Sequence, residues 1–261
     1  MNKKIILKAI NNAIGKCDYP KAIALREFDE KNYVTETYSS NEDSHGKSSP
    51  IGKLQQEQED LQASIDYDGL DRAVLGDYGL SSFIPINKYL NQAEGWENEV
   101  YYTDENGDYD PEYDEKTRTL NVRYSDNSDD YDMEYLSVFE EISALNNVID
   151  KSPRLKQDTV LYRYGHFEEG GTPNQHGVLK GFSSATYNEY VASDSIRKYP
   201  FAKSENRYMM KIYAPKGTKG VVLDNNLTGR DFQSEFLIGR NQRYIILNQD
   251  DSNKTVEILL Y

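Results

Sequence analysis

The stretch Gly229-Arg230-Asp231-Phe232-Gln233-Ser234-Glu235-Phe236-Leu237-Ile238 decides how the rest of the chain is interpreted. It is typical of a polar turn that runs directly into a short apolar strand, so it places Glu235 where a loop meets a strand. A carboxylate in such a position is common and by itself identifies no chemistry. Two earlier segments give it weight, because they supply an arginine and a serine near predicted strands in the same half of the chain.

The first of these segments, Val160-Leu161-Tyr162-Arg163-Tyr164-Gly165, places an arginine on a strand. The second, Gly181-Phe182-Ser183-Ser184-Ala185-Thr186, places a serine pair after an aromatic residue. Taken singly, each residue type has an ordinary structural explanation: an arginine in an ion pair, a serine at a strand end, a glutamate on the surface. The ordered set of arginine, serine and glutamate is what predicts a shared site.

The overall composition describes a soluble globular protein. The chain has 261 residues, 37% of them hydrophobic and 28% charged, which suggests one large domain or two small ones. A net charge of −14 means that the average surface repels nucleic acid and anionic membranes, although an average does not exclude a local basic groove. Cys17 is the only cysteine, which excludes an internal disulfide, and the scattered His45, His166 and His176 have no zinc-ligand spacing.

The N-terminus begins with positive charge but lacks the apolar run of a signal peptide, since Lys8, Asn11 and Asn12 interrupt it. No other stretch is long and apolar enough to suggest a transmembrane helix. We therefore expect a cytoplasmic protein, in the producing or the target cell, unless a dedicated export machine carries it.

Helical patterns dominate the first half of the chain. Helices are predicted over 3–15, 22–30, 53–65, 82–90 and 133–149, with a loop or linker over 38–52. The 53–65 helix is rich in Gln and Glu and is expected to be exposed. The 133–149 helix has the clearest periodicity. These patterns suggest an N-terminal helical segment and linker over 1–52 and a second unit over 53–261.

An acidic insertion over 98–132 interrupts this second unit. Its strand-like 119–124 segment predicts an acidic β-hairpin. Asp104, Asn106, Asp108 and Glu115 match calcium-loop positions, but Tyr109 stands where such a loop needs glycine. We therefore favour a solvated acidic face over a calcium site, and we predict no metal.

Short β-rich segments separated by turns follow the 133–149 helix. They cover 159–164, 181–186, 208–214, 220–224, 235–238, 243–248 and 255–261. Helices followed by antiparallel strands indicate an α+β fold.

The ordered motifs around Arg163, Ser183 and Glu235 resemble the arginine–serine–glutamate class of mono-ADP-ribosyltransferases, which includes bacterial toxins and phage-encoded relatives. Residues 211–220, 239–244 and 82–90 resemble the family's segments that frame these motifs, and the resemblance runs from about residue 60 onward except for the acidic insertion. It implies N-terminal helices followed by two packed, mostly antiparallel sheets that form a cleft for NAD. It also implies that NAD is consumed as a substrate.

The resemblance implies a role for each matching residue. Glu235 would accept a hydrogen bond from the nicotinamide ribose, Arg163 would bind phosphate, and Ser183 would hold Glu235 and the ribose in register. The remaining implied NAD-binding residues are Tyr162, Gly165, Phe182, Ser184 and Arg197, the last in a loop that covers the phosphates. The family usually has Ser-Thr-Ser where this chain has Ser183-Ser184-Ala185, so a supporting hydroxyl is expected to be missing, although Thr186 lies next to it.

Gln233 departs from the arginine-modifying members, which have glutamate there. Relatives with glutamine resemble enzymes that act on asparagine or other non-arginine side chains, and some act on nucleic-acid bases. A carboxylate attracts a guanidinium, whereas an amide can orient a neutral acceptor. Phe232 would contact the acceptor or close the core.

Three functions stay open at this point. The first is a toxin or phage factor that ADP-ribosylates a macromolecule, with protein favoured over nucleic acid because of the negative surface. The second is an NAD glycohydrolase, and the third is a binding or structural protein without turnover. The acidic insertion would serve as a docking surface for a basic partner or an immunity protein.

Overall fold

The computed structural model describes residues 3–16, 18–35, 50–78, 86–87, 90, 119–127, 130–166, 176–198, 207–223 and 235–261. Its helices are α1 (Lys3–Gly15), α2 (Tyr19–Glu27), the 3-10 helix η1 (Glu30–Asn32), α3 (Pro50–Ala63), α4 (Gly69–Asp77), α6 (Val138–Lys151) and α7 (Glu189–Lys198). Its strands are β1 (Thr119–Asn127), β2 (Asp130–Ser137), β3 (Thr159–His166), β4 (His176–Leu179), β5 (Ser183–Thr186), β6 (Arg207–Ala214), β7 (Gly220–Leu223), β8 (Glu235–Ile238), β9 (Gln242–Asp250) and β10 (Thr255–Leu260).

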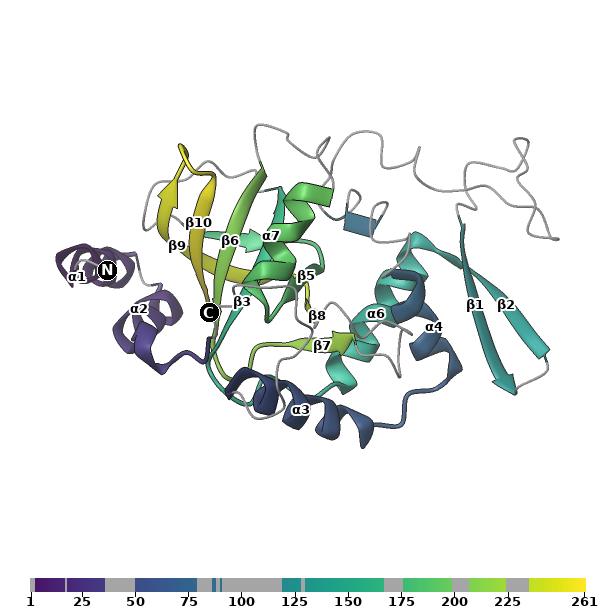
Figure 1. Cartoon of the computed structure of the whole chain (residues 1–261). Coiled ribbons are helices and arrows are strands. Elements are labelled where there is room, and N and C mark those ends of the chain that lie inside the picture. Colours follow the sequence, from purple (N-terminus) through teal and green to yellow (C-terminus); the bar gives the residue numbers. More distant parts are fainter. Residues whose placement is uncertain are drawn as a thin grey trace.

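The core of the molecule is a continuous eight-stranded sheet in the order β4-β9-β10-β6-β3-β5-β8-β7 (Figure 1). All neighbouring strands are antiparallel except β6 and β10. The contact between β3 and β5 is narrow, with the single registered pair Tyr162 and Thr186. The two predicted sheets are therefore two parts of one sheet, joined at this narrow point, and the predicted α+β class with mostly antiparallel strands is confirmed.

The two parts of the sheet share a hydrophobic core. Leu161, Ile212 and Ile258 of the five-stranded part pack in one cluster with Phe236 and Ile238 of the three-stranded part. The two parts therefore pack against each other and hold β3 and β8 in a fixed relation. This relation matters because Arg163 lies on β3 and Glu235 on β8.

Helices cover the outer faces of both parts. Ala9 of α1 and Leu25 of α2 pack with Val160, Tyr162 and other residues of the five-stranded part. The N-terminal segment also joins the sheet directly, since Val34 forms an isolated parallel bridge with Thr159. On the three-stranded part, α4 and α6 pack against β7 and β8 in a third cluster.

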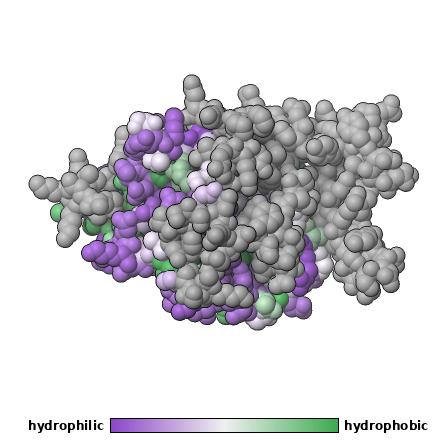
Figure 2. Space-filling view, in the orientation of Figure 1, coloured by the Kyte–Doolittle hydropathy of each residue, from purple (hydrophilic) through white to green (hydrophobic). Residues whose placement is uncertain are grey.

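The hydropathy of the surface is consistent with the burial of apolar side chains in these clusters. In Figure 2 the described residues on the visible face are mainly hydrophilic, with apolar side chains in small areas. Exposed apolar side chains of the described residues include Leu7 and Ile14 of α1 and Tyr19 and Ile23 of α2. None of the helices in the described ranges could span a bilayer, as each is too short or too polar.

Most of the predicted elements are present. The acidic hairpin is confirmed as β1 paired with β2, and Figure 1 shows it extending from the α4–α6 side of the molecule. The predicted helix over 133–149 was wrong at its start, because residues 133–137 belong to β2 and the helix begins at Val138. Pairing with β1, where Tyr135 lies opposite Asn121, outweighs the helical spacing of Tyr135. Most of the 82–90 helix, the candidate calcium-loop residues and all of 98–118 lie outside the described residues.

The expectation that the 53–65 helix is exposed was wrong for its inner face. Gln58 and Gln62 of α3 are almost fully buried. The Gln62 amide donates to the carbonyl of Val222 at 2.6 Å and accepts from the Val222 N–H at 2.9 Å. Because β7 is the edge strand of the described sheet, the amide of Gln62 satisfies backbone groups that pair with no other strand in the described part of the chain. Glutamine suits this buried position because its side-chain amide can both donate and accept a hydrogen bond.

Candidate active site

Ser184 connects the predicted arginine and glutamate. The Arg163 Nη1 donates to the backbone carbonyl of Ser184 at 2.6 Å. The hydroxyl of the same residue donates to the Glu235 Oε1 in a short hydrogen bond. One residue of β5 thus binds a guanidinium from β3 through its backbone and a carboxylate from β8 through its side chain.

The register of β5 and β8 explains why Ser184, rather than Ser183, contacts the carboxylate. Thr186 lies opposite Glu235, and Ser184 lies opposite Leu237, so these alternate residues share one face of the strand pair. Ser183 lies opposite Ile238 and is on the other face, where Ile238 and Ala185 join the main core. The prediction that Ser183 holds Glu235 is therefore corrected to Ser184.

This correction also shifts the serine motif by one residue. The stretch that presents hydroxyl groups on the Glu235 side is Ser184-Ala185-Thr186, in which Ala185 points to the core. The expected loss of the third hydroxyl therefore does not arise, because Thr186 supplies it. The Thr186 Oγ1 accepts from the Asn188 N–H at 3.1 Å, which orders the turn between β5 and α7.

Arg163 is held in a confined place. A Cβ added at Gly165 would lie 3.1 Å from the Arg163 Nε, so a larger residue there would require the guanidinium to shift by a few tenths of an ångström. Burial lowers the pKa of the Arg163 guanidinium, and the negative charge of Glu235 acts in the opposite direction. Arginine still stays charged, since its ordinary pKa is above about 12. The site therefore pairs a fixed cation with a carboxylate through Ser184.

Tyr78, directly after α4, is a site neighbour that the sequence did not reveal. Its hydroxyl donates to the carbonyl of Phe182 at 3.2 Å and accepts from the Asn87 amide at 2.8 Å. Burial raises the pKa of the Tyr78 hydroxyl, and both Arg163 and Glu235 influence it electrostatically. Nothing in the sequence links Tyr78 to a motif more than 80 residues away, although a buried tyrosine hydroxyl generally has polar partners.

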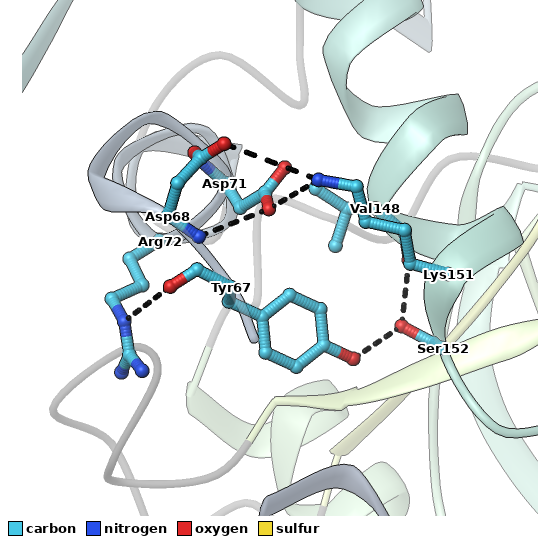
Figure 3. A network of polar contacts seen from close by, with 7 residues as sticks. All are labelled: Tyr67, Asp68, Asp71, Arg72, Val148, Lys151 and Ser152. Carbon is cyan, nitrogen blue, oxygen red and sulfur yellow. Dashed lines mark hydrogen bonds and ion pairs between the residues drawn. The ribbon is translucent and has the colours of Figure 1, made fainter. Parts of the chain in front are cut away.

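A polar network fixes α4, and with it Tyr78, against α6 (Figure 3). Asp68 and Asp71 form a capping box at the start of α4, and the Lys151 Nζ of α6 donates to the Asp71 Oδ2 at 2.7 Å. The Tyr67 hydroxyl lies 2.6 Å from the Ser152 hydroxyl, which donates to the Val148 carbonyl. The N-terminal turn of α4 is thus tied to the C-terminal turn of α6.

The other predicted site residues do not take part in the contacts between Arg163, Ser184 and Glu235 that are described above. Tyr162 is buried on the opposite side of β3 from Arg163, in the cluster with the N-terminal helices, and its hydroxyl lies 2.9 Å from the Thr35 hydroxyl. Phe182 is a core residue that packs edge-on against Tyr78 at 5.7 Å. Both aromatic rings thus have structural roles in hydrophobic clusters, and their contact with NAD stays a prediction. The backbone of Arg197 lies in the last turn of α7 rather than in the expected loop, while Phe232 and Gln233 lie outside the described residues.

Comparison with known proteins identifies the family of the chain. Residues 53–260 match the family described as ADP-ribosyltransferase exoenzyme. This match covers most of the chain, so the protein belongs to the ADP-ribosyltransferase exoenzyme family. It is an NAD-dependent mono-ADP-ribosyltransferase by class, and NAD is its substrate.

Solved structures show the same fold at low sequence identity. One is C3stau2 from S. aureus with NAD, which is 17% identical, with 87% of this chain and 98% of that chain covered and a TM-score of 0.51. Another is the Vis toxin, an ADP-ribosyltransferase from Vibrio Splendidus, which is 14% identical, with 89% of each chain covered and a TM-score of 0.53. No curated protein matches the sequence significantly.

Proposed function

We propose that Arg163, Ser184 and Glu235 form the catalytic site of a transferase that moves ADP-ribose from NAD to a non-arginine side chain of a protein. The observation that carries this proposal is the double contact of Ser184, which binds Arg163 through its carbonyl and Glu235 through its hydroxyl. Arg163 of β3 and Glu235 of β8 are thereby both hydrogen-bonded to Ser184 of β5. This is the juxtaposition that the ordered sequence motifs require.

The proposed chemistry follows from the bond that is broken. Cleavage of the nicotinamide–ribose bond leaves positive charge on the ribose, as in the oxocarbenium-like transition state of glycoside hydrolysis. In the proposal, the Glu235 carboxylate stabilises this charge and accepts a hydrogen bond from a ribose hydroxyl. The bonding pair leaves with nicotinamide, and a nucleophilic atom of the acceptor forms the new bond to the ribose carbon and releases its proton to water. The electrons thus balance without an oxidant or a reductant.

Ser184 and Arg163 have supporting roles in the proposal. The Ser184 hydroxyl fixes the Glu235 carboxylate in one orientation, so little reorganisation is needed as charge develops. Arg163 presents further N–H donors besides the one that binds Ser184, and these suit a phosphate oxygen of the dinucleotide. Gly165 supports this arrangement by leaving room for the guanidinium.

The choice of acceptor rests on Gln233, two residues before Glu235. An amide at this position donates and accepts hydrogen bonds, which suits a neutral side chain better than a guanidinium. Phe232 would contact the same acceptor. The net charge of −14 favours a protein over a nucleic acid, because a nucleic-acid backbone would be repelled. A role as a toxin or a phage factor acting on host proteins fits these properties.

The arrangement of the chain adds two proposals about its parts. We propose that residues 53–261 form the catalytic unit and that the N-terminal helices α1 and α2 cover one face of its sheet, in keeping with the shared cluster of Ala9, Leu25 and Val160. We also propose that the acidic insertion over 98–132 is the docking surface for a basic partner or an immunity protein. If deletion of 98–132 leaves binding of such a partner unchanged, the second proposal fails.

The proposed function is tested by incubating the full chain with NAD labelled in its adenylate moiety and a cell lysate. The wild type is compared with Glu235→Ala and Gln233→Ala. We expect label in protein with the wild type and none with Glu235→Ala. Gln233→Ala should suppress transfer while nicotinamide release from NAD continues. Label in nucleic acid, or NAD consumption without any labelled acceptor, would contradict the proposed acceptor; no NAD consumption by the wild type would contradict the whole proposal.

A further inference from the structure

The helices α1 and α2 expose more large apolar side chains than the rest of the described chain. Of the six such side chains that are exposed among the described residues, four belong to these two helices, namely Leu7, Ile14, Tyr19 and Ile23. Single exposed apolar side chains are ordinary on a protein surface. Their concentration on two short neighbouring helices is not, and it indicates a surface that meets a partner.

The exposed side chains follow the helical repeat. Leu7 and Ile14 are seven residues apart and therefore lie on one face of α1. Tyr19 and Ile23 are four residues apart and share a face of α2. The other sides of the helices are already used, because Leu25 is buried in the cluster with the sheet and α1 packs against α2. Each helix thus leaves an apolar face exposed although it is folded onto the domain.

Positive charge is concentrated in the same two helices. Residues 3–27 contain six Lys and Arg residues against Asp18 and Glu27, a net charge of +4 in a chain whose net charge is −14, so the rest of the chain has a net charge of −18. Lys16, directly after α1, and Arg26, in the last turn of α2, are both exposed. A segment that is basic and also exposes apolar side chains matches a partner that presents negative charge above hydrocarbon.

The basic helices and the acidic hairpin lie at opposite ends of the molecule (Figure 1). The strands β1 and β2 carry Asp126, Asp130, Asp132 and Glu134, with Arg123 as their single basic residue. A negatively charged surface that meets α1 and α2 would therefore stay distant from this acidic end. The separation of charge orients the molecule with its helices toward such a surface.

We propose that α1 and α2 form a binding surface for an anionic lipid bilayer, on which they lie in the plane of the interface. Neither helix could cross a bilayer, but lying on one requires only an apolar face with basic residues beside it. Tyr19 suits this depth, because its ring is apolar and its hydroxyl can stay hydrated. Five of the six cations are Lys, whose compact charge suits mobile head groups, whereas interfaces between proteins are depleted in Lys.

The test is co-sedimentation of the full chain with vesicles of an equal mixture of phosphatidylcholine and phosphatidylglycerol, compared with vesicles of phosphatidylcholine alone. We expect binding to the mixed vesicles at low salt that weakens as salt is added, and much weaker binding to phosphatidylcholine. Leu7→Glu should lower the partition constant by about 10-fold or more, because a buried apolar group is replaced by a charge of the same sign as the lipid. Lys16→Gln should lower it by about 5-fold at low salt.

The matched control is Phe139→Glu, the same kind of change at a side chain of α6 that is 58% exposed, as Leu7 is 60% exposed. It should bind the mixed vesicles as the wild type does. Thermal unfolding checks the fold of each variant. If Leu7→Glu unfolds early, Lys16→Gln decides, because it changes only an exposed charge and must still weaken binding.

Absence of binding to the mixed vesicles at low salt would overturn the inference, as would equal binding by the wild type and by folded Leu7→Glu. An equal loss of binding in Phe139→Glu would also overturn it, because the effect would then be one of overall charge. Analytical ultracentrifugation gives a further outcome. A dimer that Leu7→Glu abolishes, without any binding to vesicles, would assign these helices to contact with a second copy of the chain and not to lipid.

Discussion

At the scale of single residues, the hydroxyl of Ser184 donates to the Glu235 carboxylate and helps to orient it. The neighbouring Ser183 has the same side chain but faces the other side of β5. Adjacent residues of one type thus have different surroundings because strand side chains alternate. The pair offers an internal comparison, since both substitutions remove one hydroxyl from the same strand.

We expect Ser184→Ala to lower kcat for nicotinamide release by about 10- to 100-fold, because the Glu235 carboxylate loses a preorganising donor. Ser183→Ala is the matched control and should change kcat by less than about 3-fold, as typical of a substitution away from the reacting groups. Steady-state kinetics on purified proteins measure both. A larger loss in Ser183→Ala than in Ser184→Ala would show that the register-based assignment is wrong.

Some residues of the candidate site could be predicted from the sequence and others could not. Arg163 and Glu235 were identified by their positions beside predicted strands, and the structure brings both to Ser184. The choice between Ser183 and Ser184 could not be made, because it depends on which residue of β8 lies opposite. Tyr78 was missed because its proximity to Arg163 and Glu235 comes from tertiary packing of α4. Periodicity predicts elements, but it does not predict register between strands distant in sequence.

At the scale of elements, the close approach of β7 to β8 supports the strand that carries Glu235. A Cβ added at Gly220 would lie 2.3 Å from the Phe236 Cε1 and 2.6 Å from the Leu237 carbonyl oxygen. No side chain fits there without a shift of β8. Glycine at the start of β7 is therefore required by packing against the residue next to Glu235.

We expect Gly220→Ala to lower the free energy of unfolding by about 1–3 kcal/mol through overpacking. Urea denaturation measures this loss. The matched control is Gly76→Ala in α4, where an added Cβ meets no atom within 4 Å. Since alanine is the better helix former, that variant should be neutral or more stable by up to about 1 kcal/mol. A stable Gly220→Ala protein with full activity would contradict the packing argument.

The buried amide of Gln62 closes the free edge of β7, which gives α3 a structural role beyond its apolar contacts. We expect Gln62→Ala to cost about 2–4 kcal/mol of unfolding free energy, because the Val222 N–H and C=O both lose their partner. Thermal and urea denaturation measure the change. Gln56→Ala is the control on the same helix, since Gln56 donates to the exposed Asp60. If both variants are equally stable, the edge-closing contact contributes nothing.

The sequence likewise predicts some of the helices and strands and misses others. The strands β3, β6, β8, β9 and β10 were predicted within a few residues, since each combines β-branched or aromatic residues with flanking turns. The short β4 and the polar α7 were not predicted, because neither has an apolar pattern that reveals it. The buried face of α3 was missed because glutamine satisfies backbone groups where an apolar residue could not.

At the scale of the whole molecule, the N-terminal segment is held to the sheet by polar contacts as well as by the apolar cluster. The Glu30 carboxylate accepts from the Tyr213 hydroxyl at 2.7 Å and from the Lys211 Nζ at 3.1 Å. The bond from Tyr213, followed by that from Lys211, lowers the pKa of Glu30 from its ordinary value. A carboxyl with a lowered folded-state pKa adds stability above its unfolded pKa and loses this contribution as the pH falls through the folded value.

Glu30→Gln should therefore be less stable than the wild type at pH 7, and the difference should shrink as the pH falls below the ordinary glutamate pKa of about 4.3 and through the lowered pKa of the folded carboxyl. The effect is small because Glu30 is about half exposed. Thermal unfolding at pH 7 and pH 3 for both proteins gives the comparison. A difference that is the same at both pH values would show that the charge of Glu30 plays no part.

The proposed activity depends on the Glu235 carboxylate acting on NAD from its position beside Ser184 and Arg163. The most direct measurement is the rate of nicotinamide release from NAD by Glu235→Gln, which keeps the size of the side chain and removes its charge. We predict a fall in kcat of about 100-fold or more, with the Kd for NAD within about 3-fold of the wild type. A rate of nicotinamide release equal to that of the wild type would contradict the account.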